Sequence, residues 1–180
     1  MKTDVRIRYT KMIIRDSFVQ ALKSQPVNKI SVKEICALAE INRTTFYKHY
    51  TDCFDLLKQI EDELIVELQQ LVQETRHKNL SDVFVKILSS MRESGSLYMA
   101  LFSENGDSSF PSRIFNMCYE QIAPSIEIPS ASKIEQEWLY YFMAYGCSGI
   151  INHWTGNGMK EDIFEVAKYV GKLNEKLLKN

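Results

Sequence analysis

Hydrophobic residues recur at intervals of three and four along most of the chain, which is the spacing of one face of an α-helix. The first such run extends from about Thr10 to Ser24 and is stopped by Pro26. A longer helix is expected from Asp52 to about Arg76, with its apolar stripe at Leu57, Ile60, Leu64, Leu68 and Leu71. No run alternates as a strand would, so the pattern predicts an all-α protein.

Five further helices are expected after this one, separated by loops rich in Gly, Ser, Asn and Pro. Ser81 and Ser132 are the expected N-caps of two of them. Gly95-Ser96 is the expected break between the first and second, and Pro111 suits the first turn of the third. The expected ranges are 81–91, 97–102, 111–123, 133–155 and 161–178.

Residues 31–50, SVKEICALAEINRTTFYKHY, predict two short helices joined by a tight turn. Ser31 and Glu34 have the spacing of a capping box at the start of the first helix. The break falls at Glu40-Ile41-Asn42, and Asn42 is a good N-cap for a second helix from Arg43 to about Tyr50. This brings the expected total to about nine helices.

The two short helices each have one apolar face. Ile35, Cys36 and Ala39 share a face of the first, and Ile41, Phe46 and Tyr50 point from the second into the core. The outer face of the second helix is basic and bears hydroxyl groups. Two short helices joined by a tight turn, the second with such a face, indicate a helix-turn-helix DNA-binding motif. Its outward residues are Arg43, Thr44, Thr45, Tyr47, Lys48 and His49.

This stretch resembles the N-terminal DNA-binding domain of TetR-family transcriptional regulators. The resemblance rests on TTFYKHY at 44–50, on VKEICALAEIN before it and on FDLLKQIEDEL after it. A weaker similarity lies in GIINHWTGNGMKED at 149–162. The resemblance implies a three-helix DNA-binding domain over residues 1–51 and a helical ligand-binding and dimerisation domain over residues 52–180.

The charge distribution agrees with this division. The 180 residues carry a net charge of −1, but residues 1–50 hold ten Lys or Arg and four Asp or Glu, a net +6. The remaining residues hold twelve and nineteen, a net −7. A basic module on an acidic body is typical of a nucleic-acid-binding protein, although chance clustering of solvated charges gives the same totals.

Arg43 opens the second helix, where its guanidinium can pair with a guanine in the major groove. Thr44 and Thr45 can supply hydroxyl or methyl contacts, and Thr45 is alternatively a packed helix residue. Tyr47, Lys48 and His49 can reach phosphates, and the resemblance implies backbone contacts for Tyr47 and His49. His49 is alternatively a core histidine.

Four more candidates lie where two helices are expected to begin, because the backbone N–H groups there favour phosphate. They are Thr10, Lys11, Ser31 and Lys33. Any of these is alternatively a plain surface residue.

Two positions depart from the family pattern. Glu40 stands where many members have Gly, in a turn that requires a left-handed residue, at a cost of about 1–2 kcal/mol. Cys53 stands where many members have a phosphate-contacting Lys.

The C-terminal half is rich in aromatic residues, and the resemblance implies a small-molecule pocket there. The alternative is that these rings are simply core. The candidate lining residues for a small, largely apolar inducer are Tyr98, Phe102, Phe115, Tyr119, Trp138 and Phe142. Gly146 and Gly149 allow close helix–helix approach, which suits the homodimer interface that the resemblance places on the last two helices.

No catalytic constellation, phosphate-binding Gly loop or metal-ligand spacing stands out, so no enzyme activity, metal or cofactor is expected. Cys36, Cys53, Cys118 and Cys147 show no zinc or disulfide spacing, which fits a cytoplasmic compartment. The charged start of the chain lacks the apolar segment of a signal peptide, and the apolar stretch from Trp138 to Trp154 reads as a buried helix rather than a membrane span.

Two functions follow from the sequence. The first is a dimeric repressor that binds double-stranded DNA at a palindromic operator and is released by an inducer. The second is a co-regulator of the same fold that senses a ligand and binds a partner protein without reading DNA. Glu40 and Cys53 favour the second, whereas the surface from Arg43 to His49 favours the first.

Overall fold

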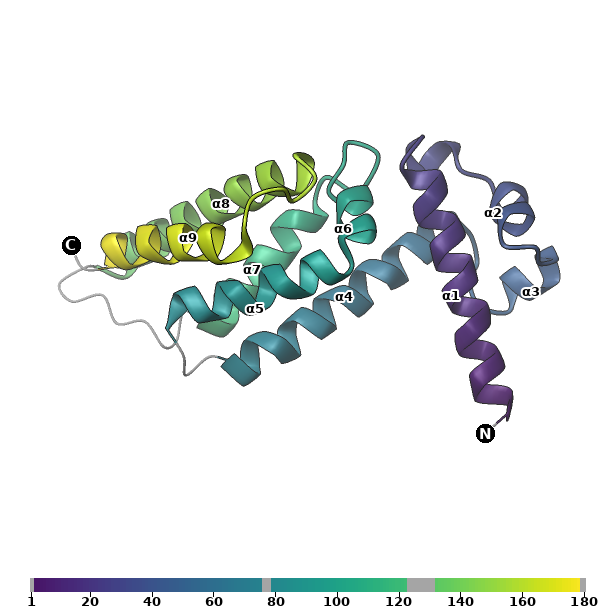
Figure 1. Ribbon diagram of the computed structural model, residues 1–180, viewed down its shortest axis with the longest axis horizontal. Coiled ribbons are helices and arrows are strands. Elements are labelled where there is room, and N and C mark those ends of the chain that lie inside the picture. Colours follow the sequence, from purple (N-terminus) through teal and green to yellow (C-terminus); the bar gives the residue numbers. More distant parts are fainter. Residues whose placement is uncertain (1, 76–78, 123–131, 179–180) are drawn as a thin grey trace.

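The computed structural model describes residues 2–75, 79–122 and 132–178, and every regular element in these ranges is helical (Figure 1). This confirms the predicted all-α class. The first four helices are α1 (Lys2–Leu22), α2 (Val32–Leu38), α3 (Arg43–Tyr47) and α4 (Cys53–Thr75), with a 3₁₀ turn at Val27–Lys29. The others are α5 (Leu80–Glu93), α6 (Gly95–Leu101), α7 (Phe110–Ile122), α8 (Lys133–Gly156) and α9 (Ile163–Leu178).

Helices α1, α2 and α3 form a small head at one end of the molecule (Figure 1). Its core contains Phe18, Ile35 and Phe46, all fully buried. The Asn42 side chain accepts a hydrogen bond from the backbone N–H of Thr45 at 2.8 Å, so the predicted cap of α3 is confirmed. Ser31 caps α2 by accepting from the N–H of Glu34 at 3.2 Å.

The turn between α2 and α3 requires one left-handed residue, and Glu40 supplies it with φ of 53°. The strain predicted from the sequence is therefore present, because an L side chain in this region costs about 1–2 kcal/mol relative to glycine. The turn is held by a hydrogen bond from the N–H of Ile41 to the carbonyl of Cys36 at 3.0 Å. These contacts fix the angle at which α3 leaves the head.

The long helix α4 runs from the head along one edge of the body, beside α5 and α7 (Figure 1). Its apolar stripe packs on α7 and α5, while α8 and α9 cover the other sides of those helices. Within the predicted stripe Leu57, Ile60, Leu64 and Leu68 are buried. The last buried apolar position of α4 is Val72, and Leu71 is only half-buried.

Several helix boundaries differ from the sequence predictions. Helix α3 ends at Tyr47 rather than near Tyr50, and α9 begins at Ile163 rather than Glu161. Helix α1 begins at Lys2 rather than Thr10. Asn79, not Ser81, caps α5, and its side chain accepts from the N–H of Asp82 at 2.9 Å. The break before α6 falls at Ser94, so Gly95 already lies inside the helix. The predicted ends of two helices at Arg76 and Ala123 lie outside the described residues.

One arginine of α7, Arg113, bridges two acidic residues of α4. Glu61 of α4 is only 2% exposed, and its Oε2 accepts a hydrogen bond from Arg113 Nη1 of α7 at 2.7 Å. Arg113 Nη2 donates to Asp62 at 2.7 Å. Burial, and then the charge of Asp107, raise the pKa of Glu61 to about 7 despite the arginine. The other carboxyl oxygen of Glu61, Oε1, is buried with no hydrogen-bond partner among the described residues, which fits a carboxyl group that retains its proton.

We predict that this carboxyl group makes stability depend on pH. A raised pKa means that the folded chain holds a proton that the unfolded chain releases, so its stabilising effect is full below about pH 4.5 and is lost as pH rises through about 7. Urea unfolding at pH 5 and pH 8 should show the wild type losing about 1–3 kcal/mol relative to Glu61→Gln. Parallel pH profiles for the two proteins would mean that Arg113 keeps Glu61 ionised throughout.

Candidate functional site

Helix α3 presents a polar face to the outside of the head. Arg43, Thr44, Tyr47 and Lys48 are all exposed, as the sequence predicts for a recognition helix. Tyr47 is 56% exposed although it is a large aromatic residue, and its ring meets that of Phe46 edge-on at 5.7 Å. Apart from this contact, more than half of the Tyr47 side chain is open to solvent.

Thr45 and His49 are partly buried. The Thr45 hydroxyl donates to Asn42 Oδ1 at 2.9 Å, so this side chain contributes to the cap of α3, in line with the packed alternative. Burial, and then the charges of Lys11 and Lys48, lower the pKa of His49. The imidazole is therefore neutral at pH 7, with a nitrogen that can donate to a phosphate oxygen.

The structure does not place Thr10 and Lys11 at the start of a helix, where the sequence predicts them. Both lie in the interior of α1, eight or more residues after its start, so no free backbone N–H groups surround them. The Thr10 hydroxyl donates to the carbonyl of Arg6 at 2.8 Å. Lys11 nevertheless lies beside the end of α3, with its Nζ 5.7 Å from the centre of the Tyr50 ring.

Ser31 and Lys33 lie at the start of α2 as predicted, and both are exposed. Cys53, in contrast, is only 4% exposed, and burial raises the pKa of its thiol to about 11. Its side chain therefore packs inside the head and offers neither charge nor contact to a phosphate.

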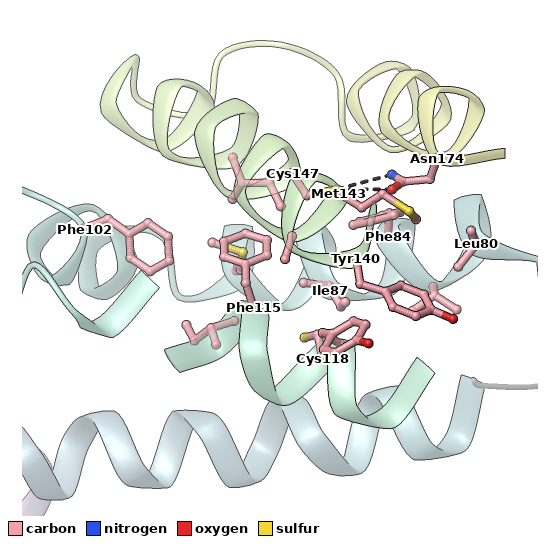
Figure 2. Close-up of a pocket in the computed structure, with 16 residues that line it drawn as sticks. Leu80, Phe84, Ile87, Phe102, Phe115, Cys118, Tyr140, Met143, Cys147 and Asn174 are labelled. Atoms are coloured by element: carbon pink, nitrogen blue, oxygen red, sulfur yellow. Dashed lines mark hydrogen bonds between the residues drawn. The ribbon is translucent and has the colours of Figure 1, made fainter. Parts of the chain in front are cut away.

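A largely apolar cavity of about 80 Å³ lies in the second half of the molecule, between α5, α7 and α8 (Figure 2). Three of the predicted lining residues, Phe102, Phe115 and Tyr119, do line it. The remaining walls come from α5, α8 and the end of α9, and they include Leu80, Phe84, Ile87, Tyr140, Met143, Cys147 and Asn174.

The other three candidates do not line this cavity. Tyr98 is 1% exposed and packs behind Phe102, with ring centres 6.0 Å apart. Trp138 and Phe142 are 64% and 66% exposed on the outer face of α8. The opposite face of α8 lines the cavity. Residues 140, 143, 144, 147 and 151 share that face because they repeat at helical spacing.

The polar atoms of the cavity wall are neutral. Asn174 is buried, and its Nδ2 donates to the carbonyl of Val170 at 2.7 Å and to Cys147 Sγ at 3.2 Å. Burial raises the pKa of Cys147, and it raises that of Cys118 to about 12, so both remain thiols. A site of this kind favours an uncharged or apolar group over an ion.

The outer faces of α8 and α9 expose large apolar side chains. On α8 most of these residues repeat at intervals of three and four, and α9 adds three more. Gly146 and Gly149 are exposed on α8, and a Cβ atom built on either would meet nothing within 4 Å. The exposed residues are Ile134, Trp138, Tyr141, Phe142, Tyr145, Phe164, Tyr169 and Leu173.

Within the described residues, no three His, Cys, Asp or Glu side chains come close enough together to hold a metal ion. No described helix is both long and apolar enough to cross a membrane.

Sequence reasoning missed the Glu61–Arg113 pair and the Asn174–Cys147 contact. Glu61 had a detectable signal, because it falls four residues after Leu57 and three before Leu64, inside the apolar stripe of α4. Asn174 similarly follows Val170 by four residues on the buried face of α9. Their partners lie on other helices, far away in the sequence, so the spacing of residues along the chain could not predict which residues pair.

Comparisons with known proteins agree with this architecture. The family model described as "Transcriptional regulator C-terminal region", a TetR model, matches residues 78–176, which is 99 of the 180 residues. A search of curated proteins found no significant match.

Solved structures show the same fold. A TetR transcriptional regulator from Streptococcus agalactiae 2603V superposes with a TM-score of 0.70 at 24% identity, covering 97% of this chain and 98% of that one. The fatty acid degradation regulator FadR from Bacillus halodurans gives 0.71 at 13% identity, covering 94% of each. Thermus thermophilus FadR, a TetR-family repressor in complex with lauroyl-CoA, superposes with a TM-score of 0.59 at 15% identity, covering 93% of this chain and 94% of that one. The matched family model, together with this fold, shows that the chain belongs to the TetR family of transcriptional regulators.

Proposed function

We propose that this protein is a ligand-responsive repressor that binds a palindromic DNA operator as a homodimer. The observation that carries the proposal is the outward face of α3. It presents Arg43, Thr44, Tyr47 and Lys48 to solvent on a helix whose cap and turn fix its orientation. A helix of this kind docks in the major groove, where Arg43 reads a base and Lys48 neutralises a phosphate.

A homodimer is supported by the apolar faces of α8 and α9. Eight large apolar side chains exposed on two adjacent helices are unusual for a monomer and typical of an interface. Gly146 and Gly149 leave room for close approach by a second helix, and no contact within the described chain needs glycine at either position. Two heads related by a two-fold axis fit half-sites about 34–36 Å apart, or a multiple of that spacing.

A small, largely apolar inducer is supported by the cavity. Its volume of about 80 Å³ is too small for a ligand of more than a few heavy atoms, so a larger ligand has to displace the walls. Displacement of α7 is transmitted to α4 by the Arg113 bridge to Glu61 and Asp62. The lauroyl-CoA bound by the Thermus FadR makes acyl chains one reasonable class to test.

The alternative is a co-regulator of the same fold that does not read DNA. Two observations favour it: the exposed carboxylate of Glu40 at the turn beside α3, and the buried neutral thiol of Cys53. The exposed cationic face of α3 favours the repressor, because a protein that only bound another protein would not need it.

We predict different effects for the two basic residues of α3. Arg43→Ala should cost about 1–3 kcal/mol at the operator and relax base preference at one position in each half-site. Lys48→Ala should weaken all sequences about equally and lower the slope of log K against log salt by about one unit per head. The measurement is fluorescence anisotropy with a duplex that the wild type selects from a random pool, and Lys86→Ala on α5 is the matched charge control.

If Arg43→Ala weakened selected and random duplexes equally, Arg43 would not read a base. A wild type that selected no duplex at all would favour the co-regulator.

We predict that a charge on the outer face of α8 dissociates the dimer. Phe142→Asp introduces a carboxylate where an apolar interface is expected, so sedimentation should show a monomer at micromolar concentration and a dimer for the wild type. Val66→Asp is the control, because Val66 is 52% exposed on α4, outside this face. A wild-type monomer would contradict the dimer, and a dimeric Phe142→Asp protein would place its interface elsewhere.

We predict that straight-chain primary alcohols raise the thermal midpoint of the wild type, more so as the chain lengthens. The reason is that an apolar chain with one neutral polar end matches the rings and the Asn174 amide of the cavity. Ala144→Leu fills part of the cavity and should reduce the shift at each chain length, whereas Ala37→Leu on the exposed side of α2 should not. Equal shifts in both variants would mean that the alcohols bind elsewhere.

A further inference from the structure

The first turns of α1 extend beyond the rest of the head. All side chains from Val5 to Tyr9 are exposed, and Figure 1 shows this end of α1 projecting away from α2, α3 and the body. We name residues 2–9 the α1 overhang. The sequence did not predict it, because the apolar periodicity that marks the packed part of α1 begins only near Thr10.

The α1 overhang gains little from packing. An isolated helix of this length is marginal in water, since its stability normally comes from an apolar face buried against a neighbour. Val5, Ile7 and Tyr9 are 56%, 43% and 61% exposed, so no such burial occurs within the described chain. A segment of this kind is stabilised when it meets a partner outside the chain.

The charged side chains described in the overhang, those from Val5 to Tyr9, are cationic. Arg6 and Arg8 both reach solvent, and no described ion pair neutralises either. Two guanidinium groups within three residues repel each other and attract a polyanion. The first fifty residues carry the net +6 charge of the chain, and the overhang forms the outer end of that segment.

The overhang continues the cationic surface at the end of α3. Arg8, Lys11 and Arg15 of α1 line one shallow groove with Tyr50. Lys11 stacks on Tyr50 and, together with Lys48, lowers the pKa of His49. Basic side chains therefore occur in succession from Lys48 past Lys11 to Arg8. Glu63, 3.9 Å from Lys11, is the acidic residue beside it.

We propose that Arg6 and Arg8 bind phosphates of the DNA backbone that flanks the segment read by α3, so that each head covers more of the duplex than its recognition helix. This inference rests on the proposed DNA-binding function. Eight residues of helix span about 12 Å, and duplex DNA carries about one charge per 1.7 Å, so several phosphates lie within that length.

An anionic membrane is the other polyanion that such a segment could meet, and the positions of the apolar residues argue against it. A helix lying on a membrane needs its apolar residues on one side. At about 100° per residue, Val5 and Tyr9 share a side whereas Ile7 points to the opposite one. Arg6 and Arg8 then flank the Val5 side on both edges, so no broad apolar face remains.

The test is the salt dependence of DNA binding by the full-length protein. The probe is a duplex selected by the wild type from a random pool, with anisotropy measured between about 50 and 200 mM salt. Arg6→Ala/Arg8→Ala should lower the slope of log K against log salt by about two units per head, and Arg6→Lys/Arg8→Lys should retain it. Lys86→Ala/Lys160→Ala, which removes two exposed charges from the body, should also retain it.

Hydroxyl-radical footprints supply the second readout. The wild type should protect sugars outside each half-site, and Arg6→Ala/Arg8→Ala should lose that outer protection alone. All three variants should unfold at the wild-type temperature, because the substituted side chains are exposed.

A wild type that binds the duplex, with an unchanged slope and footprint in Arg6→Ala/Arg8→Ala, would overturn this inference and leave the proposed function standing. A wild type that binds no duplex would overturn both. Arginine-dependent binding to phosphatidylserine vesicles, with an unchanged DNA slope, would assign the overhang to a membrane instead.

Discussion

The burial of one helix, α4, is the constraint on which the rest of the structure depends. Its first turns pack into the head through Cys53 and Leu56, and its later turns pack under α5 and α7 through Leu64, Leu68 and Val72. The buried side chains of both parts form one continuous cluster. A shift of α4 at one end therefore has to be accommodated at the other, because a close-packed core does not absorb it locally.

The Arg113 bridge links that helix to α7. Glu61 and Asp62 are adjacent on α4, and one guanidinium on α7 holds both at 2.7 Å. Just over one turn beyond Arg113, α7 presents Cys118 to the cavity. The cavity-lining residue Cys118 and the bridging residue Arg113 thus belong to the same short helix, so a shift of the cavity wall at α7 also shifts the bridge to α4.

Local signals predicted the fold well. Asn42 and Ser132 are caps whose partners lie three residues away, and both form as expected. The left-handed turn at Glu40 was predicted from the motif. The failures are tertiary: α8 is apolar on both faces, so its sequence alone could not tell which rings turn inward. Trp138 and Phe142 were assigned to the cavity for that reason, whereas Tyr140, Met143 and Cys147 occupy it. The sequence did not predict the α1 overhang, because its described apolar side chains are exposed and so do not repeat at the spacing of a buried helix face.

The cavity also has a mechanical consequence. Unfilled space inside a folded chain is lost when the chain unfolds, so the folded state occupies more volume than its atoms require. Hydrostatic pressure favours the smaller total volume, so the cavity of about 80 Å³ lined by rings from α5, α7 and α8 should add to the sensitivity of this fold to compression. A molecule that occupied the cavity would reduce that excess volume and with it the response to pressure.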